Sequence, residues 1–119
     1  MRKVIKKKAL DRGLVDFSDI ASGRRLPPIH PGETLRDEFL HPLGINVYEL
    51  ANALKMPRSR ANDIARGRRA ISADSALRLA RYFGTTPDFW LNLQTRYDLE
   101  CAKRSLGRTI QRAIVPRAA

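Results

Sequence analysis

The chain has 119 residues, with 23 lysines and arginines against 12 aspartates and glutamates, which gives a formal net charge of +11. This length suits one domain with tails, and so basic a balance indicates a polyanionic partner, either nucleic acid or an acidic membrane surface. No run is apolar enough for a membrane span of about 20 residues, and no apolar stretch follows the basic start as it would in a secretory signal. The single cysteine, Cys101, cannot form an internal disulfide, so we expect a cytoplasmic protein.

The charge is unevenly distributed along the chain. Residues 1–28 carry eight basic and three acidic residues, and residues 107–119 carry three basic residues and no acid. Residues 29–106 are nearly balanced, with twelve against nine. Because a proline pair closes the first segment, we predict a basic N-terminal extension or linker (1–28), a folded domain (29–106) and a short C-terminal tail (107–119).

From Pro31 onward the apolar spacing predicts only helices, so the expected fold class is all-α. The first helix begins at Pro31, with Glu33 in its first turn, and is expected to stop at Pro42 because the residue before a proline is pushed out of helical geometry. The second helix begins at Asn46, which forms a capping-box pattern with Glu49.

The last two predicted helices also have apolar inward faces. The fourth follows the cap Ser72 and ends at Gly84, and small or apolar residues are predicted on its inward face. These are Ala73, Ala76, Leu77, Ala80 and Phe83. The fifth follows the cap Thr86 and is expected to run to about Leu106, with an apolar stripe in the core or at a dimer interface. The stripe is Phe89, Trp90, Leu93 and Tyr97.

The stretch from Asn46 to Gly67 carries the strongest functional signal. Two short helices, the second beginning at Pro57, are separated by a turn of about three residues. This is the arrangement of a helix-turn-helix, in which the first helix crosses the DNA backbone and the second lies in the major groove. Ala51 supplies the small residue that the first helix needs where the second crosses it closely.

The outward face of the second helix predicts contacts to base edges, while Ala61 and Ile64 face inward. Arginine can bridge guanine O6 and N7, and asparagine can bridge adenine N6 and N7. The predicted base-contacting residues are Arg58, Ser59, Asn62 and Asp63. For the last of these, two interpretations stand: its carboxylate accepts from a cytosine amine, or it pairs with a neighbouring arginine.

Phosphate contacts are predicted around the same helix, where they add affinity and salt dependence but no specificity. The amide end of the helix that starts at Asn46 is a good anion site. The predicted phosphate-contacting residues are Asn46, Arg60, Arg66, Arg68 and Arg69. Two alternatives remain: a helical domain with a merely solvated basic edge, or a module whose basic patch meets an acidic protein.

No catalytic pattern is recognisable. There is no glycine-rich phosphate loop and no nucleophile elbow, and the pair Glu38 and His41 lacks a third metal ligand. The sequence therefore predicts no enzyme activity, no metal, no cofactor, no small-molecule ligand and no membrane association.

Several motifs occur in an order that is specific to one family. They are IHPGETLRDEFL at 29–40, PRSR at 57–60, IARGRRAI at 64–71, ALRLA at 76–80 and TTPDFWLNLQ at 85–94. Over about residues 27–106 the chain resembles the HigA family of antitoxins, within the XRE (Cro/repressor-like) helix-turn-helix group. It departs from the pattern at Lys55, where glycine is usual because the residue adopts positive φ, and at Ala61, where a branched aliphatic is usual.

The resemblance implies a five-helix lambda-repressor-like DNA-binding domain that forms a homodimer in the bacterial cytoplasm, associated with the nucleoid. It implies binding to double-stranded operator DNA, repression of its own operon, and neutralisation of a RelE-like (HigB-type) toxin that cleaves messenger RNA. The alternative is a stand-alone XRE-type regulator without a toxin partner. The basic N-terminal segment is either a solubilising tail or an element that follows the DNA backbone or folds on the toxin.

Overall fold

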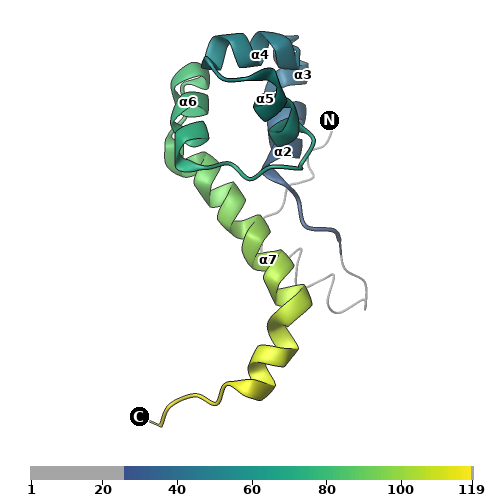
Figure 1. Cartoon of the computed structure of the whole chain (residues 1–119), viewed down its shortest axis with the longest axis vertical. Helices are drawn as coiled ribbons and strands as arrows, with labels where there is room; N and C mark the ends of the chain where they lie inside the picture. Colours follow the sequence, from purple (N-terminus) through teal and green to yellow (C-terminus); the bar gives the residue numbers. More distant parts are fainter. Residues whose placement is uncertain (1–25, 119) are drawn as a thin grey trace.

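The computed structural model describes residues 26–118, which form five helices and no strand (Figure 1). The predicted all-α, five-helix fold is therefore confirmed. Most of the predicted basic extension, residues 1–25, lies outside the described residues, and the division of the chain at 28 and 106 stays a prediction. No helix in the described part of the chain is both long and apolar enough to traverse a lipid bilayer.

The first helix is continuous but changes its winding. It consists of α2 (Pro31–Thr34), a π-helical segment η1 (Leu35–Leu40) and α3 (His41–Leu43). The expectation that Pro42 stops this helix is wrong, because the helix ends at Gly44, which adopts a left-handed conformation with φ of 67°. The wider π turns that precede the proline relieve the clash between its ring and the preceding backbone, so the helix continues through it.

The next two helices are short and closely spaced. Helix α4 (Val47–Leu54) begins at Asn46, whose side chain accepts from the Glu49 N–H while the Glu49 carboxylate accepts from the Asn46 N–H. This is the predicted capping box. Helix α5 (Arg58–Ala65) follows after Pro57, and it packs against both α4 and α2.

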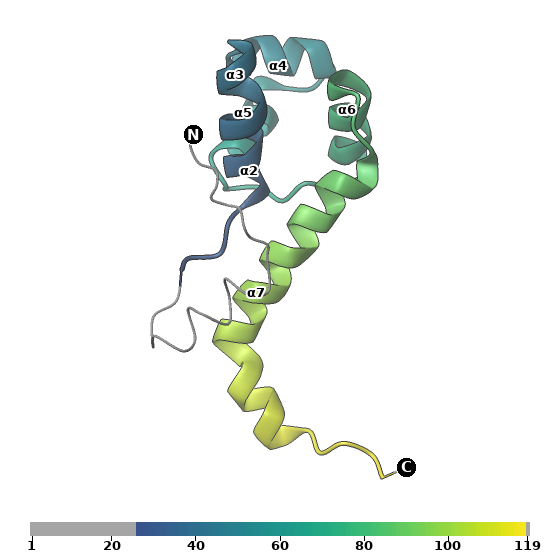
Figure 2. The ribbon, with the colours of Figure 1, turned by 180° about the vertical axis from the view of Figure 1, so that it is seen from behind.

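The last two helices form the other side of the domain. Helix α6 (Ala73–Phe83) is capped by Ser72, and α7 (Pro87–Ala113) is capped by Thr86, as the sequence predicts. The expected end of the last helix near Leu106 is wrong, since α7 continues to Ala113. Figures 1 and 2 show its C-terminal half extending away from the other helices.

The core lies between these helices and takes buried residues from each of them. Leu35, Leu50, Ile64, Leu79 and Trp90 are all at most 2% exposed. Ala61 is also buried, as predicted, which lets α5 lie close to the rest of the core. An aromatic cluster closes one end, with the rings of Phe39, Phe83 and Phe89 packed around Trp90.

Two inward positions predicted for α6 are wrong. Ala73 is exposed and Leu77 is 61% exposed, whereas Leu79 is buried together with Ala76 and Ala80. In the last predicted stripe, Trp90 is fully buried and Leu93 packs against the core, while Phe89 and Tyr97 lie at its edge. The side chain of Leu77 instead borders a hollow between α4 and α6.

Candidate nucleic-acid interface

The turn between α4 and α5 consists of Lys55, Met56 and Pro57. Lys55 adopts φ of 57° and ψ of 47°, and it is the one non-glycine residue with positive φ in the described part of the chain. A lysine in this conformation costs on the order of 1 kcal/mol more than a glycine. The buried side chain of Met56 anchors the turn to the core. The predicted turn geometry is therefore confirmed.

The C-terminal end of α5 is fixed by its own backbone. Gly67 has φ of 79°, and its N–H donates to the Ile64 carbonyl at 3.1 Å. The Arg68 N–H donates to the Asp63 carbonyl at 2.8 Å, which completes a Schellman motif. The Arg36 guanidinium on η1 donates to the carbonyl of Ala65 and holds the same helix end against the first helix.

The first helix approaches this end of α5 very closely. A Cβ on Gly32 would lie 2.1 Å from the Ile64 carbonyl oxygen, so only glycine fits there. His30, 7% exposed, caps α2 by accepting from the Gly32 N–H at Nδ1, and its ring meets Tyr97 edge-on at 4.8 Å. Burial lowers the pKa of His30 below its ordinary value, with Arg36 acting in the same direction and Glu33 and Asp98 opposing it.

The outward side of α5 and the start of α4 together line one open hollow. From α5 and its C-cap come Arg58, Ser59, Asn62 and Arg66, and from the start of α4 and its N-cap come Asn46, Val47 and Tyr48. Five of the nine predicted DNA-contacting residues are thus brought together, and no acidic residue lines the hollow. The opposite side of α5, which includes Ala61 and Ile64, is buried as predicted.

The side chain of Arg58, which lines this hollow, is oriented by a neighbouring aromatic ring. The guanidinium carbon of Arg58 lies 4.6 Å from the centre of the Tyr48 ring, which is a cation–π contact. Tyr48 is 60% exposed and was not among the residues predicted from the sequence. The sequence did contain a signal for Tyr48. The buried face of this helix is formed by Leu50, Ala51 and Leu54, so an aromatic residue on its outward face is not needed for the core.

The other four predicted residues lie elsewhere around α5. The Arg60 side chain extends toward α6, where Nη2 lies 3.4 Å from the Asp74 carboxylate. Asp63 pairs with Arg68 at 3.4 Å, so of its two interpretations the structure favours the intramolecular ion pair. Arg68 and Arg69 follow the Gly67 turn and do not line the hollow.

Sequence reasoning also missed three residues that hold this region. These are Gly32 and Arg36 at the C-terminal end of α5, and Arg78 at the turn that precedes α5. Their partners lie more than twenty residues away along the chain, so no local pattern revealed them. Among residues 26–118, no three histidine, cysteine, aspartate or glutamate side chains come together in a way that would hold a metal ion.

Two short helices, a three-residue turn and a polar outward face on the second helix define a helix-turn-helix protein. A family model described as helix-turn-helix matches residues 35–90. Virulence-associated protein I of Dichelobacter nodosus is 51% identical over 84 residues, which are 71% of this chain and 78% of that protein.

Two solved structures are similar in both sequence and fold. The Pseudomonas aeruginosa antitoxin HigA, solved with the higBA promoter, is 50% identical with a TM-score of 0.75, over 76% of this chain and 99% of that chain. An addiction module antidote protein of the HigA family from Coxiella burnetii is 44% identical with a TM-score of 0.74, over 77% of this chain and all of that one. The chain belongs to the HigA family of antitoxins, in the XRE group of helix-turn-helix proteins.

Proposed function

We propose that this chain is the antitoxin of a type II toxin–antitoxin module, which binds operator DNA as a dimer, represses its own operon and neutralises a RelE-like (HigB-type) messenger-RNA endonuclease by direct contact. The observation that carries the DNA-binding part is the hollow formed by the start of α4 and the outward side of α5, where five predicted DNA-contacting residues converge without an acid. The likeness to an antitoxin solved with its promoter supports the same conclusion.

Within this hollow, base contacts are assigned to Arg58, Ser59 and Asn62 on α5. The N-terminal part of a recognition helix enters the major groove most deeply, and all three lie in the first five residues of α5. Tyr48 stacks on Arg58 and restricts its rotamers before DNA arrives, which lowers the entropy lost on binding. Asp63 is left out of the base contacts because it pairs with Arg68.

Phosphate contacts are assigned to both ends of the hollow. The first amides of α4, with Asn46, suit one phosphate, because the start of a helix presents unpaired N–H groups and a partial positive charge. Arg66 suits the phosphates near the end of α5, with Arg68 and Arg69 further out. Arg60 is assigned to the protein instead, since it lies against Asp74.

A dimer is supported by the apolar outward side of α7. Leu99, Leu106 and Ile110 are exposed and follow each other at seven- and four-residue spacing, so they share one face of the helix. Trp90 and Tyr97, which face the domain, lie on the opposite face at this periodicity. A second copy of the chain would cover this stripe.

The dimer is tested by sedimentation equilibrium of Leu106→Glu, with Gln111→Glu as the control on another face of the same helix. We expect the first variant to shift the protein toward monomer and the second to match the wild type. A Leu106→Glu variant as dimeric as the wild type would remove this stripe as the interface.

DNA binding is tested by selecting duplexes from a randomised pool with the wild-type protein. We expect a palindromic site bound about a thousandfold more tightly than a scrambled duplex, with affinity that falls as salt rises. Equal, weak and salt-sensitive binding to both duplexes would contradict operator recognition and favour a module for an acidic protein.

Toxin neutralisation rests on family membership, and its test is separate. Open reading frames adjacent to the gene are co-expressed with this chain, and we expect one small basic protein to co-purify and to arrest growth when expressed alone. If neither neighbour binds or arrests growth while operator binding holds, the chain is a stand-alone regulator.

A further inference from the structure

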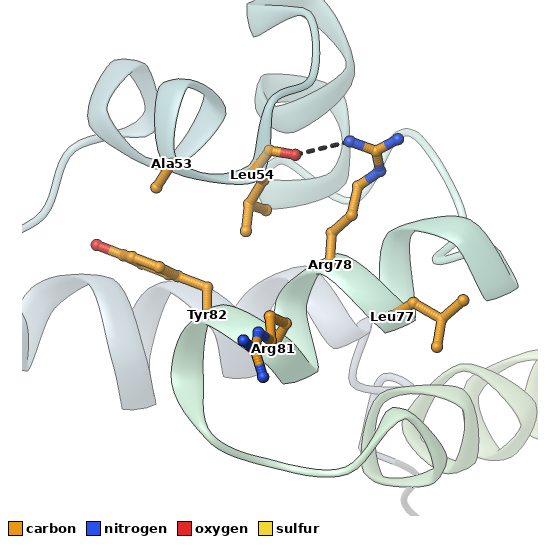
Figure 3. A pocket seen from close by; sticks show the side chains of 6 residues that line it. All are labelled: Ala53, Leu54, Leu77, Arg78, Arg81 and Tyr82. Atoms are coloured by element: carbon orange, nitrogen blue, oxygen red, sulfur yellow. Dashed lines mark hydrogen bonds between the residues drawn. The ribbon is translucent and has the colours of Figure 1, made fainter.

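Arg78, on the second turn of α6, reaches across to the turn that precedes the recognition helix. Its Nη1 donates to the Leu54 carbonyl at 2.8 Å and to the Lys55 carbonyl at 2.9 Å. Figure 3 shows the side chain rising from α6 to the Leu54 carbonyl, while Arg81 on the same helix points away from it. One guanidinium therefore binds both of the last carbonyls before Met56.

These two carbonyls are among those that the helix itself leaves without a backbone donor. The last carbonyl groups of an α-helix have no intrahelical donor, and a cation near a helix C-terminus also interacts favourably with the helix dipole. The Lys55 and Met56 N–H groups are satisfied by the carbonyls of α4, at Asn52 and Ala51. The Leu54 and Lys55 carbonyls of the turn are bound by Arg78. One of them belongs to Lys55, the residue whose backbone is in the left-handed conformation.

The same arginine is held by a carboxylate that also reaches α5. Arg78 Nε donates to Asp74 Oδ1 at 2.5 Å, and Arg60 Nη2 on α5 lies 3.4 Å from the same oxygen. The hydrogen bond from Arg78 is the main reason that the pKa of Asp74 is lowered, so the carboxylate stays charged. The first turns of α6 thus contact the turn before α5 and a side chain of α5 itself.

We propose that Arg78 is a positioning residue for DNA recognition: it fixes the Leu54–Lys55 turn and so sets the direction in which α5 meets the groove. This rests on the proposed function. Arg78 does not line the hollow of Arg58 and Asn62, and lies instead at the separate hollow between α4 and α6. It therefore acts through the turn and makes no contact with DNA.

The first test needs no DNA. Amide spectra of Arg78→Ala are compared with those of Arg81→Ala, which removes the same charge from the same helix without touching the turn. We expect Arg78→Ala to shift the amides of residues 54–60 and to speed their hydrogen exchange, with α7 unchanged. Shifts confined to α6, or equal shifts in both variants, would overturn the proposal whether or not the protein binds DNA.

The second test measures specificity on the duplex selected by the wild-type protein and on a scrambled one. Because two hydrogen bonds from a charged donor are lost, we expect Arg78→Ala to lower the ratio of specific to scrambled affinity by about tenfold. The slope of affinity against salt is expected to stay unchanged, since no phosphate contact is removed. A slope reduced by about one would instead identify Arg78 as a phosphate contact and overturn the proposal.

Two further variants separate positioning from general stability. Arg78→Lys keeps the charge but lacks the planar guanidinium, so we expect the ratio of specific to scrambled affinity to fall by about threefold. Lys55→Gly removes the left-handed side chain, and in that background Arg78→Ala is expected to lose clearly less specificity than in the wild type. Equal losses in both backgrounds, or a fall in melting temperature with full specificity, would contradict positioning through the turn.

Discussion

The two ends of α5 are held by different means. At its C-terminal end, Gly67 provides the left-handed turn, Gly32 lies against the Ile64 carbonyl, and Arg36 binds the Ala65 carbonyl. At its N-terminal end, no side chain caps the helix, and the preceding turn holds its left-handed residue with the help of Arg78. The buried end is thus fixed by backbone packing together with the Arg36 hydrogen bond, and the end proposed to meet DNA by the hydrogen bonds of Arg78. Substitutions at the first end should therefore affect mainly the free energy of unfolding, whereas those at the second should affect DNA recognition as well.

The largest effect is expected for Gly32→Ala at the buried end. The new Cβ would lie 2.1 Å from a backbone oxygen that cannot move without shifting α5, so we expect a loss of about 3 kcal/mol in the free energy of unfolding. Urea denaturation measures it. The matched control is Gly107→Ala on α7, where a Cβ meets nothing within 4 Å and helix propensity predicts a gain of about 0.5–1 kcal/mol. Similar outcomes for both variants would refute the close approach.

Gly67→Ala should have a smaller effect, because it forces a side chain into a left-handed turn. We expect a loss of about 1–2 kcal/mol. Gly84→Ala serves as the comparison, since it has a similar φ of 73° but open space around its Cβ, whereas His30 lies 3.5 Å from a Cβ at Gly67. Similar losses in thermal unfolding would assign the effect to backbone conformation, and a much larger loss at Gly67 would assign it to the His30 contact.

Lys55→Gly reverses the sign of the effect at the other end. It removes the side chain from the left-handed turn, so we expect a gain of about 0.5–1 kcal/mol in the free energy of unfolding. Urea denaturation again measures it, with Lys103→Gly in the exposed part of α7 as a control that should lose stability. A loss at Lys55 would mean that the lysine side chain contributes to the turn in a way that its backbone angles do not explain.

The smallest effect is expected from pH. Because burial lowers the pKa of His30 below 6.5, the unfolded chain takes up the proton first as the pH falls. The free energy of unfolding should therefore be constant above about pH 7 and should decline as the pH falls below 6.5. His30→Asn keeps a capping acceptor and should remove this slope, whereas His41→Asn, at an exposed position, should leave it. If the free energy of unfolding of His30→Asn still declines below pH 6.5, His30 is not the cause of the pH dependence.

The features that could be predicted from the sequence are local ones. The caps at Asn46, Ser72 and Thr86 and the turns at Lys55 and Gly67 follow from a few neighbouring residues. They were enough to define the five helices and the outward side of α5.

The wrong or missing features depend on distant parts of the chain or on unusual winding. Pro42 stays helical because π turns precede it, and Leu77 is exposed because α6 turns its Leu79 face to the core. Arg60 is directed toward Asp74 and Arg78 toward the turn, contacts that span 14 and 24 residues. No local pattern contains that information.

The most direct test of operator recognition through α5 uses Arg58→Ala and Asn62→Ala on a set of duplexes in which each base pair of one half-site is changed in turn. We expect each variant to lose discrimination at one base pair, by about 1–3 kcal/mol, and to keep it at the others. Full discrimination at every position in both variants, or an equal loss at all of them, would contradict α5 as the helix that contacts the bases.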